Sequence, residues 1–302
     1  MELLWFYLAL GSAFFFAIKD LLAKKLFKEK KFSEEGLLFE EYLLLLILVL
    51  LFLFPKVEFA SFYGNWGLFL SKGIFLFMAN YIYFLMLRKY EISLVSPLIN
   101  LTPIALVVLS YFLLSEQLTF LQILGISITI LAVYFLEIIK HHHHKTEPLK
   151  HHFSLFNLKS KDSIFFILSV VMVLAFSITA VIDKFIFSSG ITVYTNLYFT
   201  ALIVLVILTG ILIKEKRLKK SISEVVREPK SLFVAFFANV SQVLVLFAIA
   251  IPGALISLII PIRRLSTLIS SIFGGILFHE KHLKKKFFYT LLMLVGVVLI
   301  VV

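Results

Sequence analysis

The chain has 302 residues, of which 61% are hydrophobic and 16% are charged, and 34 of them are Phe. This apolar share exceeds the roughly 45–50% of soluble domains and excludes a water-soluble globular fold. The net charge of +11 falls mainly between apolar runs, so we interpret it as a membrane-topology signal and expect no nucleic-acid partner. The absence of Cys excludes disulfides and thiolate sites.

Apolar segments separated by charged breaks follow one another along the whole sequence. A stretch of about 20 apolar residues is long enough to cross about 30 Å of hydrocarbon as a helix. The segments are approximately 3–19, 37–54, 66–87, 91–114, 120–138, 163–187, 194–213, 231–250, 253–278 and 287–302. They predict an all-α integral membrane protein with ten transmembrane helices in the lipid bilayer.

A polar linker divides the ten segments into two groups of five. It covers residues 141–162 and holds six of the eight histidines. The sequence therefore predicts one five-helix unit over residues 1–140 and another over residues 163–302. Histidine runs can bind zinc or nickel, or they can be part of a solvated basic linker, and both readings stay open.

The two groups of five resemble each other. The motif SLVSP at residues 93–97 recurs as SLIIP at residues 257–261, an offset of 164, and Asp20 corresponds to Asp183 at an offset of 163. Because five is odd, the second copy must enter the bilayer from the opposite side. We therefore predict two inverted five-helix repeats, an architecture that tends to place the substrate site between the repeats near the midplane.

Further residues complete a pattern that resembles a known family. They are Pro103, Glu116, Thr119 and Gly125 in the first copy and Gly274, Gly275 and Glu280 in the second, although Thr267 and Tyr289 stand in the second copy where Pro103 and Gly125 predict proline and glycine. Ten helices in two inverted fives with this pattern are similar to the EamA family of the drug/metabolite transporter superfamily. The resemblance implies a carrier of small metabolites, amino acids or drugs rather than an enzyme.

Arg263 and Arg264 lie near the middle of the ninth segment. A central Arg costs about 2.5–3.5 kcal/mol to insert, so the pair requires compensation. We expect Pro261 to interrupt the helix there, one guanidinium to bind a carboxylate or phosphate of the substrate, and Asp20 or Asp183 to act as charge partner or coupling group. The alternative is a structural role for both arginines, neutralised by an acid and backbone carbonyls.

Other polar side chains fall within predicted spans, where an unpaired amide would be costly. At the offset of 164, Arg264 corresponds to Asn100 and Ser266 to Thr102. We expect a hydrophilic substrate cavity lined by Arg263, Arg264, Ser266, Asn100, Thr102, Asn80, Asn239 and Gln242. Each amide alone is more typical of contacts between helices. Glu40 and Glu41, at the start of the second span, are expected to be solvated.

These features predict a secondary transporter that works by alternating access. The cargo is expected to be a small anionic or zwitterionic metabolite, such as an amino acid or organic acid, because cations occupy the deepest positions. One alternative is a divalent-metal transporter fed by the histidine linker, and another is a membrane enzyme or lipid-flipping accessory protein. No cofactor motif is present, and the coupling ion, direction and oligomeric state stay open.

The basic residues are distributed unequally between the two sides of the predicted membrane. Loops after the odd-numbered spans carry 24 Lys and Arg, whereas loops on the opposite side carry 3. The positive-inside rule then places both termini outside a cytoplasmic-type cell membrane. Precedent in the resembled family places the termini in the cytoplasm, so the two indications conflict.

Overall fold

The computed structural model describes residues 4–29, 32–105, 109, 119–141, 161–251, 256–280 and 282–301. All regular structure in these ranges is helical. The first part contains α1 (Leu4–Lys28), α2 (Glu34–Leu48), α3 (Phe59–Lys89), α4 (Ile92–Leu98) and α6 (Phe120–His141). The second contains α7 (Lys161–Ser188), α8 (Val193–Lys214), α9 (Leu218–Arg227), α10 (Ser231–Ala250), α11 (Ile256–Leu277) and α12 (Leu283–Val301).

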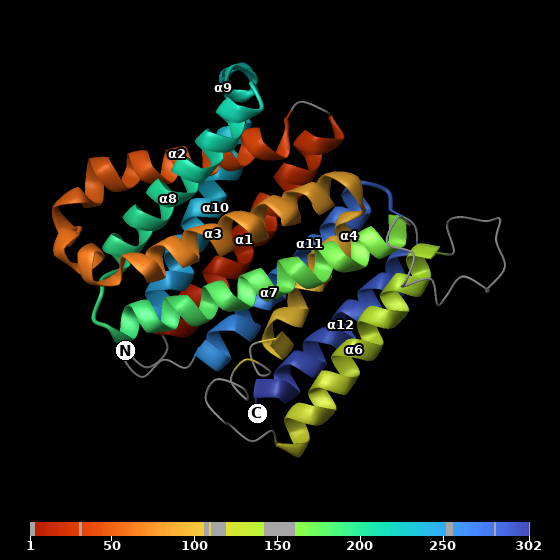
Figure 1. Cartoon of the computed structure of the whole chain (residues 1–302). Helices are drawn as coiled ribbons and strands as arrows, with labels where there is room; N and C mark the ends of the chain where they lie inside the picture. The colour runs from red at the N-terminus through yellow and green to blue at the C-terminus, as the bar shows by residue number, and fades with distance from the viewer. Residues whose placement is uncertain are drawn as a thin grey trace.

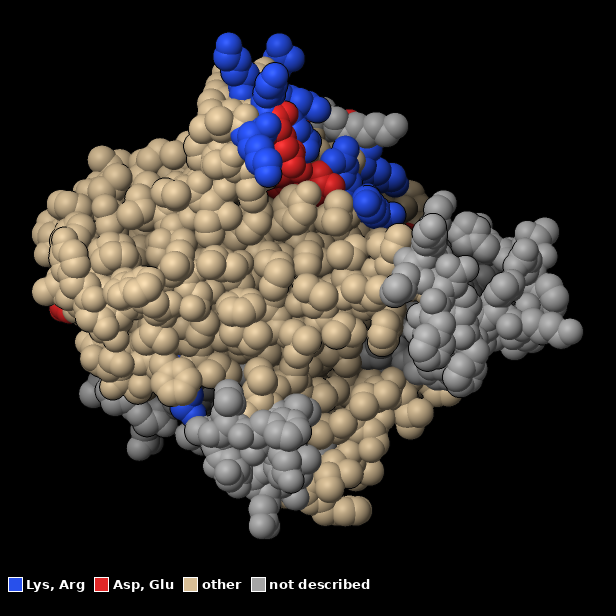
Figure 2. Space-filling model, viewed as in Figure 1, with Lys and Arg blue, Asp and Glu red and all other residues tan. Residues whose placement is uncertain are grey.

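Six helical stretches within the described ranges are long and apolar enough to cross a membrane. They are Leu4–Lys28, Glu34–Lys56, Phe59–Lys89, Ser163–Ser188, Val193–Lys214 and Ser231–Ala250. On the face in Figure 2, charged side chains gather around α9, and a broad belt below them is almost free of charge. The protein is therefore a multi-pass integral membrane protein. The other four predicted spans include residues that are not fully described, so the number ten stays a prediction.

Local sequence explains where α2 begins and ends. Ser33 caps the helix, since its Oγ accepts a hydrogen bond from the Gly36 backbone N–H at 3.1 Å. Two glutamates in the first turn complement the helix dipole. After Leu48 the chain forms a π-helical turn, Val49–Leu53, and then a 3-10 turn, Phe54–Lys56, that contains Pro55. The helix therefore loosens at the end that lies away from α9.

Helices of the first half pack mainly on helices of the second. The pairs include α1 with α10, α3 with α7, α2 with α8, α4 with α11 and α6 with α12, and α1 also packs on α11 and α3 on α8. The first five pairs are compatible with an inverted repeat, since exchanging the halves in chain order converts α1–α10 into α3–α7 and leaves the other three unchanged. The repeat itself stays a prediction. Figure 1 places the start of α1 and the end of α12 away from α9.

The predicted break at Pro261 is wrong, because α11 runs without interruption from Ile256 to Leu277. Membrane helices tolerate proline where neighbouring groups satisfy the freed backbone carbonyl. The change in helix type occurs instead in the other copy of the motif. There α4 ends at Leu98, directly after Pro97, and continues as the 3-10 turn Ile99–Leu101.

Candidate functional site

A cavity of about 90 Å³ lies between the two halves of the bundle. Residues of α1, α2, α3, α7, α8, α10 and α11 line it, together with Ile99 and Thr102. Six of the predicted site residues contribute to its wall: Asn80, Thr102, Asn239, Gln242, Arg263 and Arg264. Six further polar residues that we did not predict also line it: Lys19, Glu41, Tyr42, Lys72, Thr179 and Thr200.

The two arginines reach the cavity from α11 and keep part of their hydrogen-bonding capacity free. Arg264 is only 8% exposed. The Nε atoms of Arg263 and Arg264 have no hydrogen-bond partner among the described residues. Arg263 donates one long hydrogen bond, 3.4 Å from Nη2 to Oε1 of Gln242, and its guanidinium carbon lies 5.2 Å from the centre of the Phe16 ring. Unsatisfied charged donors in a buried cavity favour an anionic ligand.

Asp183 is neutralised by a lysine that comes from the other half of the chain. Nζ of Lys72 lies 2.5 Å from Oδ1 of Asp183 and donates at 2.7 Å to Oδ1 of Asn196. The amide of Asn196 in turn donates to Asp183 at 2.9 Å. This cluster, the Lys72–Asp183–Asn196 triad, joins α3 to α7 and α8 and is deeply buried.

Asp20 has a different set of partners. Nζ of Lys19 lies 3.1 Å from its Oδ1, the hydroxyl of Tyr83 donates to its Oδ2 at 2.5 Å, and Ser270 donates at 3.4 Å. The ammonium of Lys19 also lies 4.1 Å from the centre of the Phe16 ring, within the range of a cation–π contact. The positive charge near Asp20 therefore comes from the adjacent residue of the same helix.

In the described residues each acid forms its ion pair with a lysine and not with an arginine, so the role of Asp20 or Asp183 as charge partner or coupling group stays a prediction. The loop counts of 24 and 3 basic residues given above include both lysines. Because Lys19 and Lys72 are buried in α1 and α3, each side's count falls by one, to 23 and 2. The sequence does contain signals of these two buried lysines, since Lys19 directly precedes an acid and Lys72 interrupts an apolar run.

Two predicted site residues, Asn100 and Ser266, lie outside the cavity wall. Nδ2 of Asn100 donates to Oγ1 of Thr267 at 3.2 Å, and Thr267 donates to the backbone carbonyl of Arg264 at 2.8 Å. Asn100 therefore ties the 3-10 turn after α4 to α11, which is the alternative of contacts between helices. Ser266 is 2% exposed and is buried next to this contact.

The expectation that Glu40 and Glu41 are solvated is also wrong. Glu40 is 2% exposed, and Glu41 lines the cavity. The amide of Asn239 donates at 3.0 Å to the backbone carbonyl of Glu41 and holds this part of α2 against α10. The amide of Asn80 on α3 donates at 3.0 Å to the hydroxyl of Tyr42 on α2.

Comparison with known proteins supplies the family. Residues 3–138 match the model of the EamA-like transporter family. Over these residues the chain is similar to that family. The resemblance seen in the sequence is thereby confirmed over the first half of the chain, and the family is one of transporters within the drug/metabolite transporter superfamily. No curated protein matches the chain. The EamA-like half supplies Lys19, Glu41 and Lys72 to the cavity, and the arginines come from the half beyond the match.

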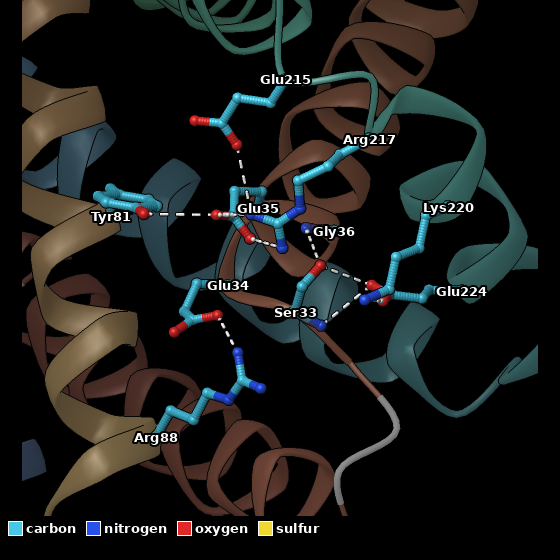
Figure 3. A network of polar contacts seen from close by, with 10 residues as sticks. All are labelled: Ser33, Glu34, Glu35, Gly36, Tyr81, Arg88, Glu215, Arg217, Lys220 and Glu224. Carbon is cyan, nitrogen blue, oxygen red and sulfur yellow. Dashed lines mark hydrogen bonds and ion pairs between the residues drawn. The ribbon is translucent and has the colours of Figure 1, made fainter. Parts of the chain in front are cut away.

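A network of ion pairs lies between the cavity and the end that carries α9, and it joins the EamA-like half to the second half (Figure 3). Arg217, which precedes α9, contacts both carboxylate oxygens of Glu35 at 2.9 and 3.2 Å. Glu224 of α9 accepts hydrogen bonds from Ser33 at 3.0 and 2.6 Å. Glu35 precedes Glu41 by six residues, about 9 Å along α2. The network thus joins the two halves at the α9 end of the bundle.

A second contact between the halves lies at the same end of the bundle. The carboxylate of Glu280, which follows α11, accepts hydrogen bonds from the backbone N–H groups of Ile92 and Ser93 at 2.9 and 3.3 Å. A carboxylate at these positions satisfies donors that a helix N-terminus leaves open. Lys286 forms ion pairs with Glu280 and Glu91. Glu116, the equivalent of Glu280, lies outside the described residues.

The described residues contain no group of three or more His, Cys, Asp or Glu side chains that could hold a metal ion. The histidine linker, on which the metal-transport alternative depends, lies outside these residues except for the backbone of His141, Lys161 and Asp162. The structure therefore gives the metal alternative no supporting observation.

Proposed function

We propose that the protein is a secondary transporter of the EamA type that carries a small anionic or zwitterionic metabolite, such as an amino acid or organic acid, across the cell membrane. The observation that carries this proposal is the presence of two arginines, with unsatisfied donors, on the wall of a buried cavity. A guanidinium presents donors in a planar fork that matches a carboxylate or phosphate.

The charges around the cavity support an anionic group on the cargo. Lys19 and Lys72 are each neutralised by an aspartate. Arg263 and Arg264 have no ion pair among the described residues, so their charges remain for a ligand. Because insertion of an unpaired Arg into a membrane costs several kcal/mol, about 2.5–3.5 on insertion scales, a bound anion stabilises the occupied state.

The size of the cavity supports a small cargo. At about 90 Å³ it is well below the roughly 300 Å³ at which pockets for drug-sized molecules begin. A metabolite of a few heavy atoms fits this volume, and a large lipophilic drug would require the helices to separate.

The position of the cavity supports alternating access. It lies between the halves, and the ion pairs at the α9 end join the halves on one side of it. In an inverted repeat, the contacts that close one end of the bundle would break while the equivalent contacts at the other end form. We propose that ten helices in two inverted fives perform this movement, and that the basic α9 end faces the cytoplasm.

A thermal-shift panel with purified protein tests the proposal. The probes are L-leucine, L-glutamate, succinate, citrate and glucose 6-phosphate. We expect at least one probe to stabilise the wild type, and Arg263→Gln and Arg264→Gln to weaken that binding about tenfold or more, because each removes a charge-assisted contact. Lys184→Gln is the matched control, since Lys184 is an exposed cation outside the cavity wall. Unchanged binding in both arginine variants would refute the proposal.

A further inference from the structure

The cavity contains one acid that the ion pairs described above do not use. Glu41 lines the cavity from α2, and its Oε2 is buried without a hydrogen-bond partner among the described residues. The two lysines on the cavity wall are already paired, Lys19 with Asp20 and Lys72 with Asp183. Glu41 therefore brings to the cavity a carboxyl group that has no ion pair in this part of the chain.

Helix α10 contacts both the part of α2 that carries this acid and the part of α11 that carries the arginines. Asn239 holds the backbone of Glu41 at 3.0 Å, and Gln242 accepts from Arg263 at 3.4 Å. Residues three apart on a helix are neighbours on one face, with Cβ atoms about 5–6 Å apart. One turn of α10 therefore contacts the acidic and the basic side of the same cavity, so a short ligand can reach both.

We propose that Glu41 binds a positively charged nitrogen of the cargo while Arg263 or Arg264 binds its anionic group, so that the cargo is a small zwitterion with a primary ammonium. This inference rests on the function proposed above and adds a specificity-determining residue to it. A buried carboxylate without a partner is costly, and an ammonium donates up to three charge-assisted hydrogen bonds to it. A hydroxyl in the same place supplies one neutral donor and leaves the charge of Glu41 unbalanced.

Such a site rejects a ligand that lacks the ammonium more strongly than it distinguishes side chains of different size. Removing one partner of a buried polar pair leaves the other unsatisfied, whereas a missing methylene costs only its own burial. The preference for an amine over an isosteric hydroxyl is therefore the property that reports on Glu41.

The test measures binding to purified protein with matched ligand pairs. The probes are L-alanine, L-leucine and L-phenylalanine, each paired with its 2-hydroxy acid: lactate, 2-hydroxyisocaproate and phenyllactate. We expect the wild type to bind at least one amino acid about tenfold or more tighter than its hydroxy acid. In Glu41→Gln this preference should fall to less than about twofold, with affinity for the hydroxy acid retained, since the anion site is intact.

The control variant is Glu40→Gln. Glu40 is the adjacent acid, is buried, and does not line the cavity, so its substitution should keep the preference. Melting of Glu41→Gln in detergent should occur at or above the wild-type temperature, because an unpaired buried charge has been removed. If that variant does not fold, Glu41→Asp gives the second readout: the shortened carboxylate should weaken amino-acid binding and leave hydroxy-acid binding unchanged.

The outcomes separate the two proposals. If Glu41→Gln keeps the preference for the amine while Arg263→Gln abolishes binding, Glu41 is not the ammonium site and the proposed anion transporter stands. The same conclusion follows if Glu41→Gln keeps the preference but abolishes transport driven by a pH gradient, because Glu41 then carries a proton. If both arginine variants bind all probes like the wild type, the proposed function itself fails.

Discussion

Asp20 and Asp183 lie 163 residues apart, at positions that the predicted repeat makes equivalent, yet they are neutralised in different ways. Asp183 takes its charge partner from the opposite half, through the Lys72–Asp183–Asn196 triad. Asp20 takes its charge partner from the adjacent residue and adds hydrogen bonds from Tyr83 and Ser270. At Asp183 an ion pair therefore joins the two halves of the chain. At Asp20 the ion pair is local, and hydrogen bonds connect the halves.

Lys72→Met should have the largest effect on this comparison. It leaves Asp183 buried without its cation, and removing one partner of a buried ion pair costs about 3–5 kcal/mol. The melting temperature in detergent should fall strongly, and transport should be lost. The double variant Lys72→Met with Asp183→Leu should recover most of the stability, because both charges are gone. A single variant as stable as the wild type would show that the triad does not join the halves.

Lys19→Met should cost less, about 2 kcal/mol, because Asp20 retains hydrogen bonds from Tyr83 and Ser270 that stabilise its charge. The two lysine variants are compared by thermal denaturation in one detergent. The order Lys72→Met below Lys19→Met supports the contrast between the sites, and the reverse order would contradict it.

Tyr83→Phe removes a single donor to Asp20 and no charge. A loss of about 1 kcal/mol is expected, since the ion pair with Lys19 remains. The combined variant Tyr83→Phe with Lys19→Met should lose more than the sum of the two, because the remaining carboxylate then has only Ser270. Simple additivity would show that Asp20 does not depend on these groups jointly.

Arg217→Gln, at the α9 end, should have the smallest effect on stability, less than about 1 kcal/mol, because the side chain is 35% exposed and water screens its pairs with Glu35. The loss should disappear in 1 M salt.

Since the chain has no native Cys, a single cysteine at Thr200 on the cavity wall reports access to the site. Faster alkylation in Arg217→Gln is expected, and an unchanged rate would show that the network does not close the cavity.

Much of the fold could be predicted from the sequence, because a long apolar run bounded by charges favours a membrane-spanning helix largely independently of its tertiary contacts. The stretch 43–54 illustrates this, since it lies in the second apolar helix of the structure, Glu34–Lys56. The arginines could be placed at the cavity for the same reason: two charges within an apolar segment require a polar environment.

Two groups of the site, Lys19 and Glu41, could not be assigned to it because they lie near the boundaries of apolar runs. Lys19 and Glu41 look like interfacial residues by position, and only the packing of α1 and α2 against other helices reveals that they face a cavity. Lys72 pairs with Asp183, which is 111 residues away in the sequence, and no local pattern predicts such a partner. Pro261 predicted a break that the structure does not have, since α11 is continuous through it.

The most direct test of the account is counterflow exchange in proteoliposomes, which needs no knowledge of the coupling ion. Vesicles loaded with one unlabelled amino acid or organic acid of the panel are diluted into the same labelled compound. The account predicts exchange of at least one carboxylate-bearing compound by the wild type and by Lys184→Gln, and loss of about nine-tenths of that exchange in Arg263→Gln. Equal exchange in Arg263→Gln, Arg264→Gln and the wild type would contradict it.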